Sequence, residues 1–343
     1  MKDVAPAPLT EAEEISDIAF GFMGSKALFA ALHHGVFTAL ADGPMTAEAL
    51  GAATGLHAER ARTLATALAA LGLVAVEDDR FANSPAAEAF LVKGAKHDFG
   101  DYLRLQVDRQ MYPLLDQIDQ ALGGDLPEDA TDSYESWFSD AEEARLYSES
   151  QHSGSLGPAR GLAKLADLSE ARSYLDVGGG TGAYAITLCK AFPKLRATIV
   201  DFPNVAAVGK RYVEAAGLSD RVDYVEGNAL EAEWPAGQDA LLMSYLFSGV
   251  PGESHDGLLG RAFETMNPGG RIMIHDFVVN AERNGPKLAA LWQLQHTAFT
   301  PSARSVDDAW LAEALERAGF EDVTVQPMIP GMTMLAMGVK PKG

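Results

Sequence analysis

The sequence has a single cysteine, Cys189, in 343 residues, so no disulfide can form within the chain. Cys189 lies in a segment with helical periodicity, where a free thiol is more often a small buried hydrophobe than a nucleophile. With one cysteine and no HExxH pattern, we expect no metal site. No uninterrupted apolar run reaches the roughly 18 residues of a spanning helix, and the acidic N-terminal segment is unlike a signal peptide. We therefore expect a cytoplasmic protein.

Positive charge is also scarce. There are 27 Lys and Arg residues against 48 Asp and Glu, which gives a formal charge of −21. Such a field repels the phosphates of nucleic acids and of anionic membranes, so we expect neither as a partner. The chain is 47% hydrophobic and 22% charged, as in ordinary globular proteins. Its length favours two domains.

Residues 1–105 have helical patterns and little strand. The stretch "ALFAALHHGVFTAL" repeats apolar residues at helical spacing, and Gly43-Pro44 follows it. Thr46 begins a further helix, and after a longer helix come two short strands joined by an acidic turn. This order outlines a winged helix. Because the longer helix carries two arginines and no basic stripe, we interpret 1–105 as a dimerisation domain rather than a DNA reader. Residues 106–165 are predicted to be a helical linker that contributes to the substrate pocket.

Residues 166–343 alternate between strands and helices. The predicted strands are "SYLDVG", "RATIVDF", "VDYVEG", "DALLMSYL", "RIMIHDFVV", "EDVTVQPM" and "MTMLAMGVK". The alternation predicts an α/β fold with a doubly wound sheet, whose last two strands form an antiparallel pair. Ser305 and Asp308 predict a capping box at the start of the helix "DDAWLAEALERAGF", which Gly319 ends.

The strongest motif is "LDVGGGTGAYAITLCKAFP", in which a strand ends at Asp176 and a glycine loop leads into a helix. Glycines let a ligand approach the backbone, and the helix N-terminus offers free N–H groups. The loop also matches a dinucleotide fingerprint, but an acidic Asp176 suits the ammonium of S-adenosylmethionine (SAM) better than a pyrophosphate. The next two strands end near Asp201, which can accept ribose hydroxyls, and near Asn228, beside the adenine. These three strand ends predict SAM as the cofactor.

With "VDFP", "EGNAL", "MNPGGRIMI" and "LERAGF" in order, the whole chain resembles the dimeric class I SAM-dependent O-methyltransferases of the caffeate, hydroxyindole and carminomycin type. The resemblance implies a Rossmann-like methyltransferase domain behind a winged-helix dimerisation domain, a homodimer, a small-molecule substrate and S-adenosylhomocysteine (SAH) as product. The cofactor contacts expected are Asp176, Gly178, Gly180, Asp201, Phe202, Asn228, Ala229, Ser244 and Tyr245. Family members usually have Asp at position 228.

The chain departs from this family at the general base. The family has "HDWPDE" after the fourth strand, where this chain has "SGVPGE", so Ser248 replaces the catalytic histidine. The family glutamate that orients the base corresponds to Asp276. A later pair, His255-Asp256, is expected on the surface. An alcohol benefits strongly from a base, whereas a thioether has no proton to lose, so the missing base favours a thioether acceptor.

We therefore expect base-free S-methylation of a thioether acid, as in the 4-methylthio-2-hydroxybutyrate S-methyltransferase branch of dimethylsulfoniopropionate synthesis. Two alternatives stay open. One is O-methylation of a phenolic or polyketide small molecule whose nucleophile ionises readily or whose base is His152, His275 or His296. The other is a catalytically silent SAM-binding dimer. A sulfonium product would need aromatic or acidic neighbours and a polar hook. The expected substrate contacts are Arg109, Tyr112, Tyr147, Gln151, His152, Phe247, Ser248, His275, Asp276, Trp292 and His296.

Overall fold

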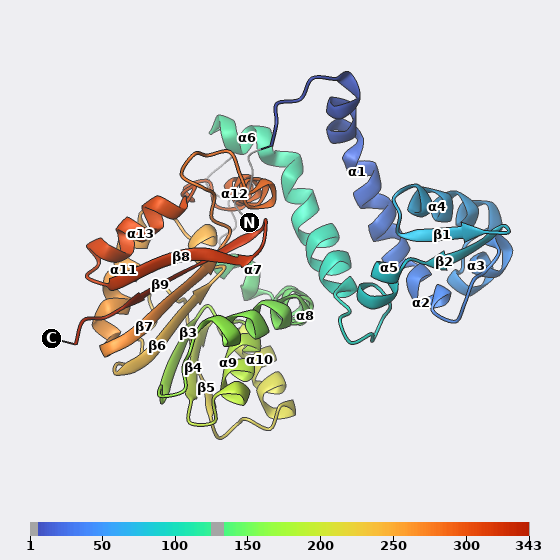
Figure 1. Cartoon of the computed structure of the whole chain (residues 1–343). Coiled ribbons are helices and arrows are strands. Elements are labelled where there is room, and N and C mark those ends of the chain that lie inside the picture. The colour runs from blue at the N-terminus through green and yellow to red at the C-terminus, as the bar shows by residue number, and fades with distance from the viewer. Residues whose placement is uncertain (1–5, 125–133, 343) are drawn as a thin grey trace. The chain divides into compact units, whose positions relative to one another are not determined.

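The computed structural model describes residues 6–124 and 134–342 (Figure 1). Contacts within the chain divide it into two compact units, Ala7–Pro113 and Leu114–Gly343. The division falls inside the segment that the sequence assigned to a linker. The predicted boundaries at residues 105 and 165 remain predictions.

The N-terminal unit is mostly helical and carries one small antiparallel hairpin, β1 with β2. Thr46 caps α3 as predicted, because its Oγ1 accepts a hydrogen bond from the Ala49 N–H at 3.3 Å. The core of this unit includes Phe37, Leu50 and Leu68. Its elements are α1 (Ala12–His33), α2 (Val36–Leu40), α3 (Ala47–Thr54), α4 (Ala58–Ala70), β1 (Val74–Glu77), β2 (Arg80–Asn83), α5 (Pro85–Phe90) and the π-helix η1 (Tyr102–Met111).

Helix α1 is unusually exposed for its composition. By length and hydropathy alone it could cross a membrane, although no uninterrupted apolar run was found in the sequence. Only Phe29 and Ala31 of this helix are buried. The exposed fraction lies between 51% and 67% for Ile15, Ile18, Phe20, Phe22 and Met23.

The C-terminal unit contains a seven-stranded sheet in the order β5-β4-β3-β6-β7-β9-β8. All seven predicted strands are confirmed, and β9 runs antiparallel to both β7 and β8. The strands are β3 (Ser173–Val177), β4 (Arg196–Asp201), β5 (Val222–Glu226), β6 (Gln238–Ser244), β7 (Met266–Asp276), β8 (Glu321–Ile329) and β9 (Thr333–Val339). Helix η2 (Tyr112–Gln117) spans the division between the two units. The helices after it are α6 (Ile118–Gly123), α7 (Tyr134–Ser139), α8 (Ala141–Leu165), α9 (Ala183–Ala191), α10 (Pro203–Ala215), η3 (Phe247–Gly249), α11 (Ser254–Thr265), α12 (Lys287–Phe299) and α13 (Asp308–Arg317).

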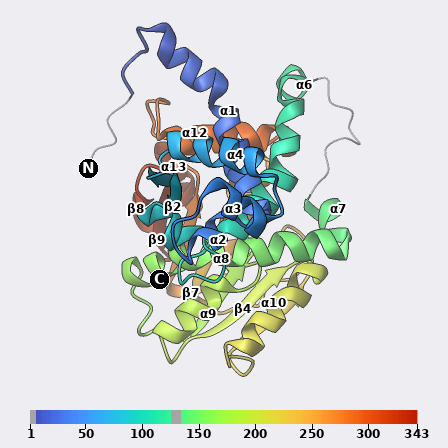
Figure 2. The ribbon, with the colours of Figure 1, turned by 90° about the vertical axis from the view of Figure 1, so that its right-hand side faces the viewer.

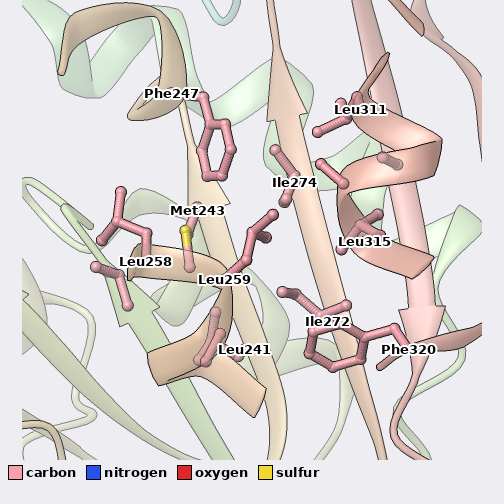
Figure 3. Packing of buried hydrophobic residues seen from close by; sticks show 14 of the residues in the cluster. Leu241, Met243, Phe247, Leu258, Leu259, Ile272, Ile274, Leu311, Leu315 and Phe320 are labelled. Atoms are coloured by element: carbon pink, nitrogen blue, oxygen red, sulfur yellow. The ribbon is translucent and has the colours of Figure 1, made fainter. Parts of the chain in front are cut away.

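Helices cover both faces of this sheet. On one face, α8, α9 and α10 lie together (Figure 2). Leu162 of α8, Leu188 of α9 and Ile199 of β4 belong to one cluster of buried hydrophobic residues. Cys189 belongs to this layer and is fully buried, as expected. On the other face, α11 and α13 pack on β6 and β7. Figure 3 shows this layer, which contains Leu241, Met243, Leu258, Leu259, Ile272, Ile274, Leu311, Leu315 and Phe320.

Two local predictions are wrong. The N-cap of α13 is Asp307, whose Oδ1 accepts from the Trp310 N–H at 2.8 Å, and not Ser305. The Ser305 hydroxyl instead donates to Gln293 Oε1 at 2.6 Å. His255 is fully buried rather than on the surface. Its ring stacks on Phe247 at 4.6 Å, and its Nε2 lies 2.9 Å from the Phe247 carbonyl.

Candidate active site

A cavity of about 190 Å³ lies at the carboxyl ends of β3, β4, β5 and β6. Ligands bind at this edge in open α/β sheets, because the loops that follow the parallel strands converge there. The described residues that line the cavity are Tyr134, Glu135, Phe138, Tyr147, Ser148, Gln151, Gly178, Gly180, Thr181, Asp201, Phe202, Val205, Asn228, Ala229, Leu230, Tyr245, Leu246, Gly249, Val250 and Pro251.

The glycine loop is held in place by Asp201 at the end of β4. Gly178 and Gly180 have φ angles of 70° and 58°, in the left-handed region that favours glycine. The Gly180 N–H donates to Asp201 Oδ2 at 2.7 Å, and the Phe202 N–H donates to Oδ1 at 2.8 Å. Burial raises the pKa of Asp201 to about 6. Each carboxylate oxygen keeps a further lone pair, which can accept a ligand hydroxyl.

Asn228 follows β5 at another side of the cavity. Its Oδ1 accepts from the Leu230 N–H at 3.0 Å, and its Nδ2 donates to Glu135 Oε2 at 2.9 Å. Both ends of the amide therefore have protein partners. The negative charge on this side comes from Glu135 of α7, which sequence reasoning missed.

Aromatic rings form one wall of the cavity. Phe138 of α7 lies 4.8 Å from the ring of Tyr147 and 5.9 Å from that of Phe202, measured between centroids. Tyr134 lies 4.4 Å from Phe299. The Gln151 amide donates to the Tyr147 hydroxyl at 3.1 Å, so these two of the three predicted substrate residues on α8 are brought together.

Ser244 and Tyr245 end β6 beside His275, but only Tyr245 lines the cavity. Tyr245 has a φ of 57°, which is strained for an aromatic residue. His275 is fully buried: its Nδ1 lies 3.0 Å from Ser244 Oγ and 2.9 Å from Tyr184 Oη, and its Nε2 lies 2.8 Å from Thr333 Oγ1. Burial lowers the pKa of His275 to about 3. Both ring nitrogens are engaged away from the cavity.

From the sequence, Ser248 and Asp276 are predicted to stand where the O-methyltransferases that this chain resembles have a catalytic histidine and its orienting glutamate. The Ser248 hydroxyl and N–H donate to the Asp276 carboxylate at 2.6 Å and 3.0 Å, and the Phe277 N–H donates to it at 2.7 Å. Burial raises the pKa of Asp276. Ser248, Asp276 and Phe247 are buried, and none of them lines the cavity.

The remaining histidines predicted in the site also lie off the cavity lining. His152 Nδ1 is 2.7 Å from the hydroxyl of Thr181, and its ring stacks on Tyr212 at 3.8 Å. Burial lowers the pKa of His152 to about 4. Burial is also the main reason why the pKa of His296 is lowered to about 4. Both imidazoles are therefore neutral at pH 7.

Three other predicted substrate residues do not line this cavity. Trp292 stacks on Phe277 at 4.4 Å within a separate hydrophobic cluster. Arg109 and Tyr112 belong to the N-terminal unit, where the Lys26 ammonium lies 4.8 Å from the Tyr112 ring. Their roles remain predictions.

Asp176 lies beneath the glycine loop. It is fully buried, and a side chain at Gly179 would place Cβ 2.6 Å from the Asp176 carboxyl carbon. Among the described residues, neither of its carboxylate oxygens has a hydrogen bond of good geometry, although the Tyr174 hydroxyl and the Ala185 N–H act to lower its pKa. Burial raises the pKa of Asp176 to about 7. The predicted contact with a cofactor ammonium is not tested by this position below the cavity.

The electrostatic character of the cavity is simple. The only charged side chains among its described lining residues are those of Glu135 and Asp201, and both are acidic. Ser148 adds a buried hydroxyl without a partner among the described residues. The lining thus combines two carboxylates, several aromatic rings and a glycine loop, which suits a cationic ligand with hydroxyl groups. Ser148 and Glu135 were not predicted from the sequence; the one feature that could have indicated them is that each lies close in sequence to an aromatic residue, which is a weak signal for a binding site.

Comparison with known proteins defines the class. The O-methyltransferase domain family matches residues 127–321, and the O-methyltransferase dimerisation domain family matches residues 16–93. The chain therefore belongs to the O-methyltransferase family, and it is a methyltransferase as the sequence motifs indicated.

Individual relatives extend over nearly the whole chain. It is 31% identical over 328 residues to the 3-hydroxy-5-methyl-1-naphthoate 3-O-methyltransferase of Streptomyces sahachiroi, covering 95% of this chain and 94% of that protein. It is 28% identical to the tetracenomycin polyketide synthesis 8-O-methyl transferase of Streptomyces glaucescens, covering 96% and 97%. The structure of human N-acetylserotonin methyltransferase in complex with SAM matches with a TM-score of 0.85 at 22% identity, covering 98% and 99%. The predicted methyltransferase fold is confirmed.

Proposed function

We propose that the chain transfers a methyl group from SAM to a hydroxyl of a phenolic or polyketide-type small molecule. The acidic and aromatic cavity at the strand ends carries this proposal. SAM bears a sulfonium and an ammonium, so a lining without a basic side chain among the described residues favours it over a pyrophosphate cofactor. When bound, SAM supplies an electrophilic methyl group.

The protein residues around the cavity divide the work of holding that cofactor. Gly178 and Gly180 leave room for close approach to the backbone. Asp201, oriented by two N–H donors, would accept the ribose hydroxyls. The side chains of Asn228 and Glu135 would together form the side of the pocket next to the adenine. Phe202, Ala229 and Tyr245 line the same cavity and would add contacts, whereas Ser244 and Asp176, which do not line it, would act from behind the lining.

A phenolic acceptor suits a cavity without an imidazole among its described lining residues. A phenol has a pKa near 10, about six units below the ~15.7 of water and comparable alcohols. It therefore needs far less help from a base than an aliphatic alcohol does. The ring of Phe138 and its aromatic neighbours offer a surface against which a flat acceptor can stack. The naphthoate and tetracenomycin relatives, by their names, act on such hydroxyls.

A substrate screen with isotope-labelled SAM tests this proposal. The panel contains phenols, hydroxynaphthoates, aliphatic alcohols and methylthio acids, and products are identified by mass spectrometry. A labelled aryl methyl ether is the expected product. A sulfonium formed from a methylthio acid would instead establish S-methylation of a thioether. SAM binding without turnover of any acceptor would favour a catalytically silent dimer. Asp201→Ala is the inactive control.

We also propose that the chain forms a homodimer through a winged-helix N-terminal unit and acts in the cytoplasm, without nucleic-acid or membrane partners. Large apolar side chains such as Ile18 and Phe22 are more than half exposed on α1, within the match to the dimerisation domain. A second copy would remove them from water. Light scattering should give a molar mass twice that of one chain, and the Ile18→Glu variant should have a molar mass closer to that of a single chain.

A further inference from the structure

Tyr224 lies in the middle of β5 and reaches the glycine loop from below. Its hydroxyl donates to the carbonyl oxygen of Gly180 at 3.0 Å. The N–H of the same Gly180 donates to Asp201 Oδ2 at 2.7 Å. Both polar backbone groups of one loop glycine are therefore fixed by side chains, one from β5 and one from β4. Tyr224 does not line the cavity.

The space for this hydroxyl exists because α10 has a glycine opposite it. A Cβ added at Gly209 would lie 1.9 Å from the Tyr224 hydroxyl oxygen, 2.6 Å from the ring carbon that bears it and 2.9 Å from the Gly180 carbonyl oxygen. Real Cβ atoms do not approach so closely. At Gly182, an added Cβ would lie 3.2 Å from the same hydroxyl. Three glycines thus surround a single phenolic oxygen.

Gly180 needs an external restraint of this kind. Its φ of 58° is easily reached by glycine, but glycine also has the largest choice of other conformations. Rotation of its peptide would turn the carbonyl or the N–H toward the cavity and change the shape of the loop. A hydrogen bond at each end of the residue opposes that rotation. Burial raises the pKa of Tyr224, so the hydroxyl keeps its donor proton across the neutral range.

We propose that Tyr224, accommodated by Gly209, is a positioning residue that locks the Gly180 peptide and keeps the glycine loop in its cofactor-binding conformation. This inference rests on the proposed SAM site. Because Tyr224 does not touch the cavity, the lock acts on cofactor affinity and leaves the transfer step itself unchanged.

Four full-length variants test the lock: Tyr224→Phe, Gly209→Ala, the two combined, and Ser173→Ala as a matched control. Ser173 Oγ also donates to a backbone carbonyl, that of Gly237 at 2.9 Å, but at the opposite end of β3. Titration calorimetry gives the Kd for SAH, kinetics with saturating SAM give kcat, and thermal unfolding of the free protein gives stability.

The lock predicts that Tyr224→Phe weakens SAH binding about three- to tenfold, the equivalent of one ordinary hydrogen bond, with kcat changed less than twofold. Ser173→Ala should lower the unfolding temperature while leaving Kd unchanged. Gly209→Ala should weaken binding more than Tyr224→Phe does. It should cost less in the Tyr224→Phe background, where the 1.9 Å conflict with the hydroxyl oxygen is gone and the 2.6 Å conflict with the ring carbon remains.

Three results would overturn the inference. Tyr224→Phe could leave the Kd within twofold of the unaltered protein, or Ser173→Ala could weaken binding as much as Tyr224→Phe does, which would reduce the effect to general stability. The effects of Gly209→Ala and Tyr224→Phe could also be additive, which would separate the two residues. SAH binding by the unaltered protein is measured before any variant is made. If the unaltered protein did not bind SAH, the proposed cofactor itself would be wrong.

Discussion

Replacing Asp176 with Asn should make the protein more stable at neutral and alkaline pH. This carboxyl group is fully buried, and neither oxygen has a hydrogen bond of good geometry among the described residues. The Tyr174 hydroxyl and the Ala185 N–H act to lower its pKa, but burial outweighs them. Burial raises its pKa from 3.8 to about 7. Because the folded protein holds the proton more tightly than the unfolded chain does, stability falls as the pH rises between these two values.

The size of the effect follows from the two pKa values. The difference is about three units, each equivalent to 1.36 kcal/mol, so ionised Asp176 costs the folded state about 4 kcal/mol above pH 7. An asparagine of nearly the same shape cannot ionise, so the variant avoids this cost. At pH 5 the carboxyl of the folded protein is still protonated. About 3 kcal/mol of the unfolding free energy that Asp176→Asn gains at pH 8 should therefore be absent at pH 5.

Urea denaturation of the cofactor-free protein and of the variant at pH 5 and at pH 8 measures the change in unfolding free energy at each pH. Asp239→Asn is a matched control with the opposite sign. Against the penalty of burial, hydrogen bonds from Asn267 and from the backbone of Arg172 and Ser173 lower the pKa of Asp239. That variant should lose stability at neutral pH. If Asp176→Asn gained nothing at pH 8, or gained the same amount at both pH values, desolvation of Asp176 would not be the source of the cost.

Further predictions concern the cofactor and the pH profile. Asp201→Ala should abolish SAH binding in calorimetry, because the loop loses its anchor and the ribose its acceptor; retained affinity would exclude the ribose role. Asn228→Asp should weaken SAH binding because it places a second carboxylate beside that of Glu135, and adding Glu135→Gln should restore binding. If binding did not recover, the two residues would not act together on the cofactor. Burial keeps His152 and His296 neutral above about pH 5, so replacing either with glutamine should leave the pH profile of kcat unchanged; an inflection near pH 6.5 that disappears on replacement would indicate a histidine base.

The fold could be predicted closely from the sequence because local and long-range signals agree. Strands such as β3, β6 and β9 are apolar runs bounded by polar turns, and the helix-length segments after β3, β4 and β6 allow parallel crossovers. Thr46 and Gly319 were identified as helix boundaries from chemistry that acts within four residues. Ser305 was misassigned because Asp307, two residues later, is an equally good cap by composition, and only the path of the chain decides between them.

The site could be predicted in part, and the division has a physical reason. Gly180, Asp201 and Asn228 follow strand ends, so the topology of the sheet alone brings them together. Predictions that depended on where a side chain points had no such support. His275 follows the same rule of position, yet β7 directs its ring inward to hydroxyl partners. Glu135 lies on a short helix far from the loop in sequence, and no local pattern connects it with Asn228.

The missing histidine bears on the acceptor more than on the competence of the enzyme. At its position the Ser248 hydroxyl is committed to Asp276, and His275 is engaged at both nitrogens, so none of these groups is placed to take a proton from a ligand in the cavity. What remains is positioning and exclusion of water, which accelerate an acceptor that ionises by itself. For a series of phenols of equal size, kcat at a fixed neutral pH should therefore rise as the acceptor pKa falls, in step with the ionised fraction. A rate independent of acceptor pKa would require a protein base.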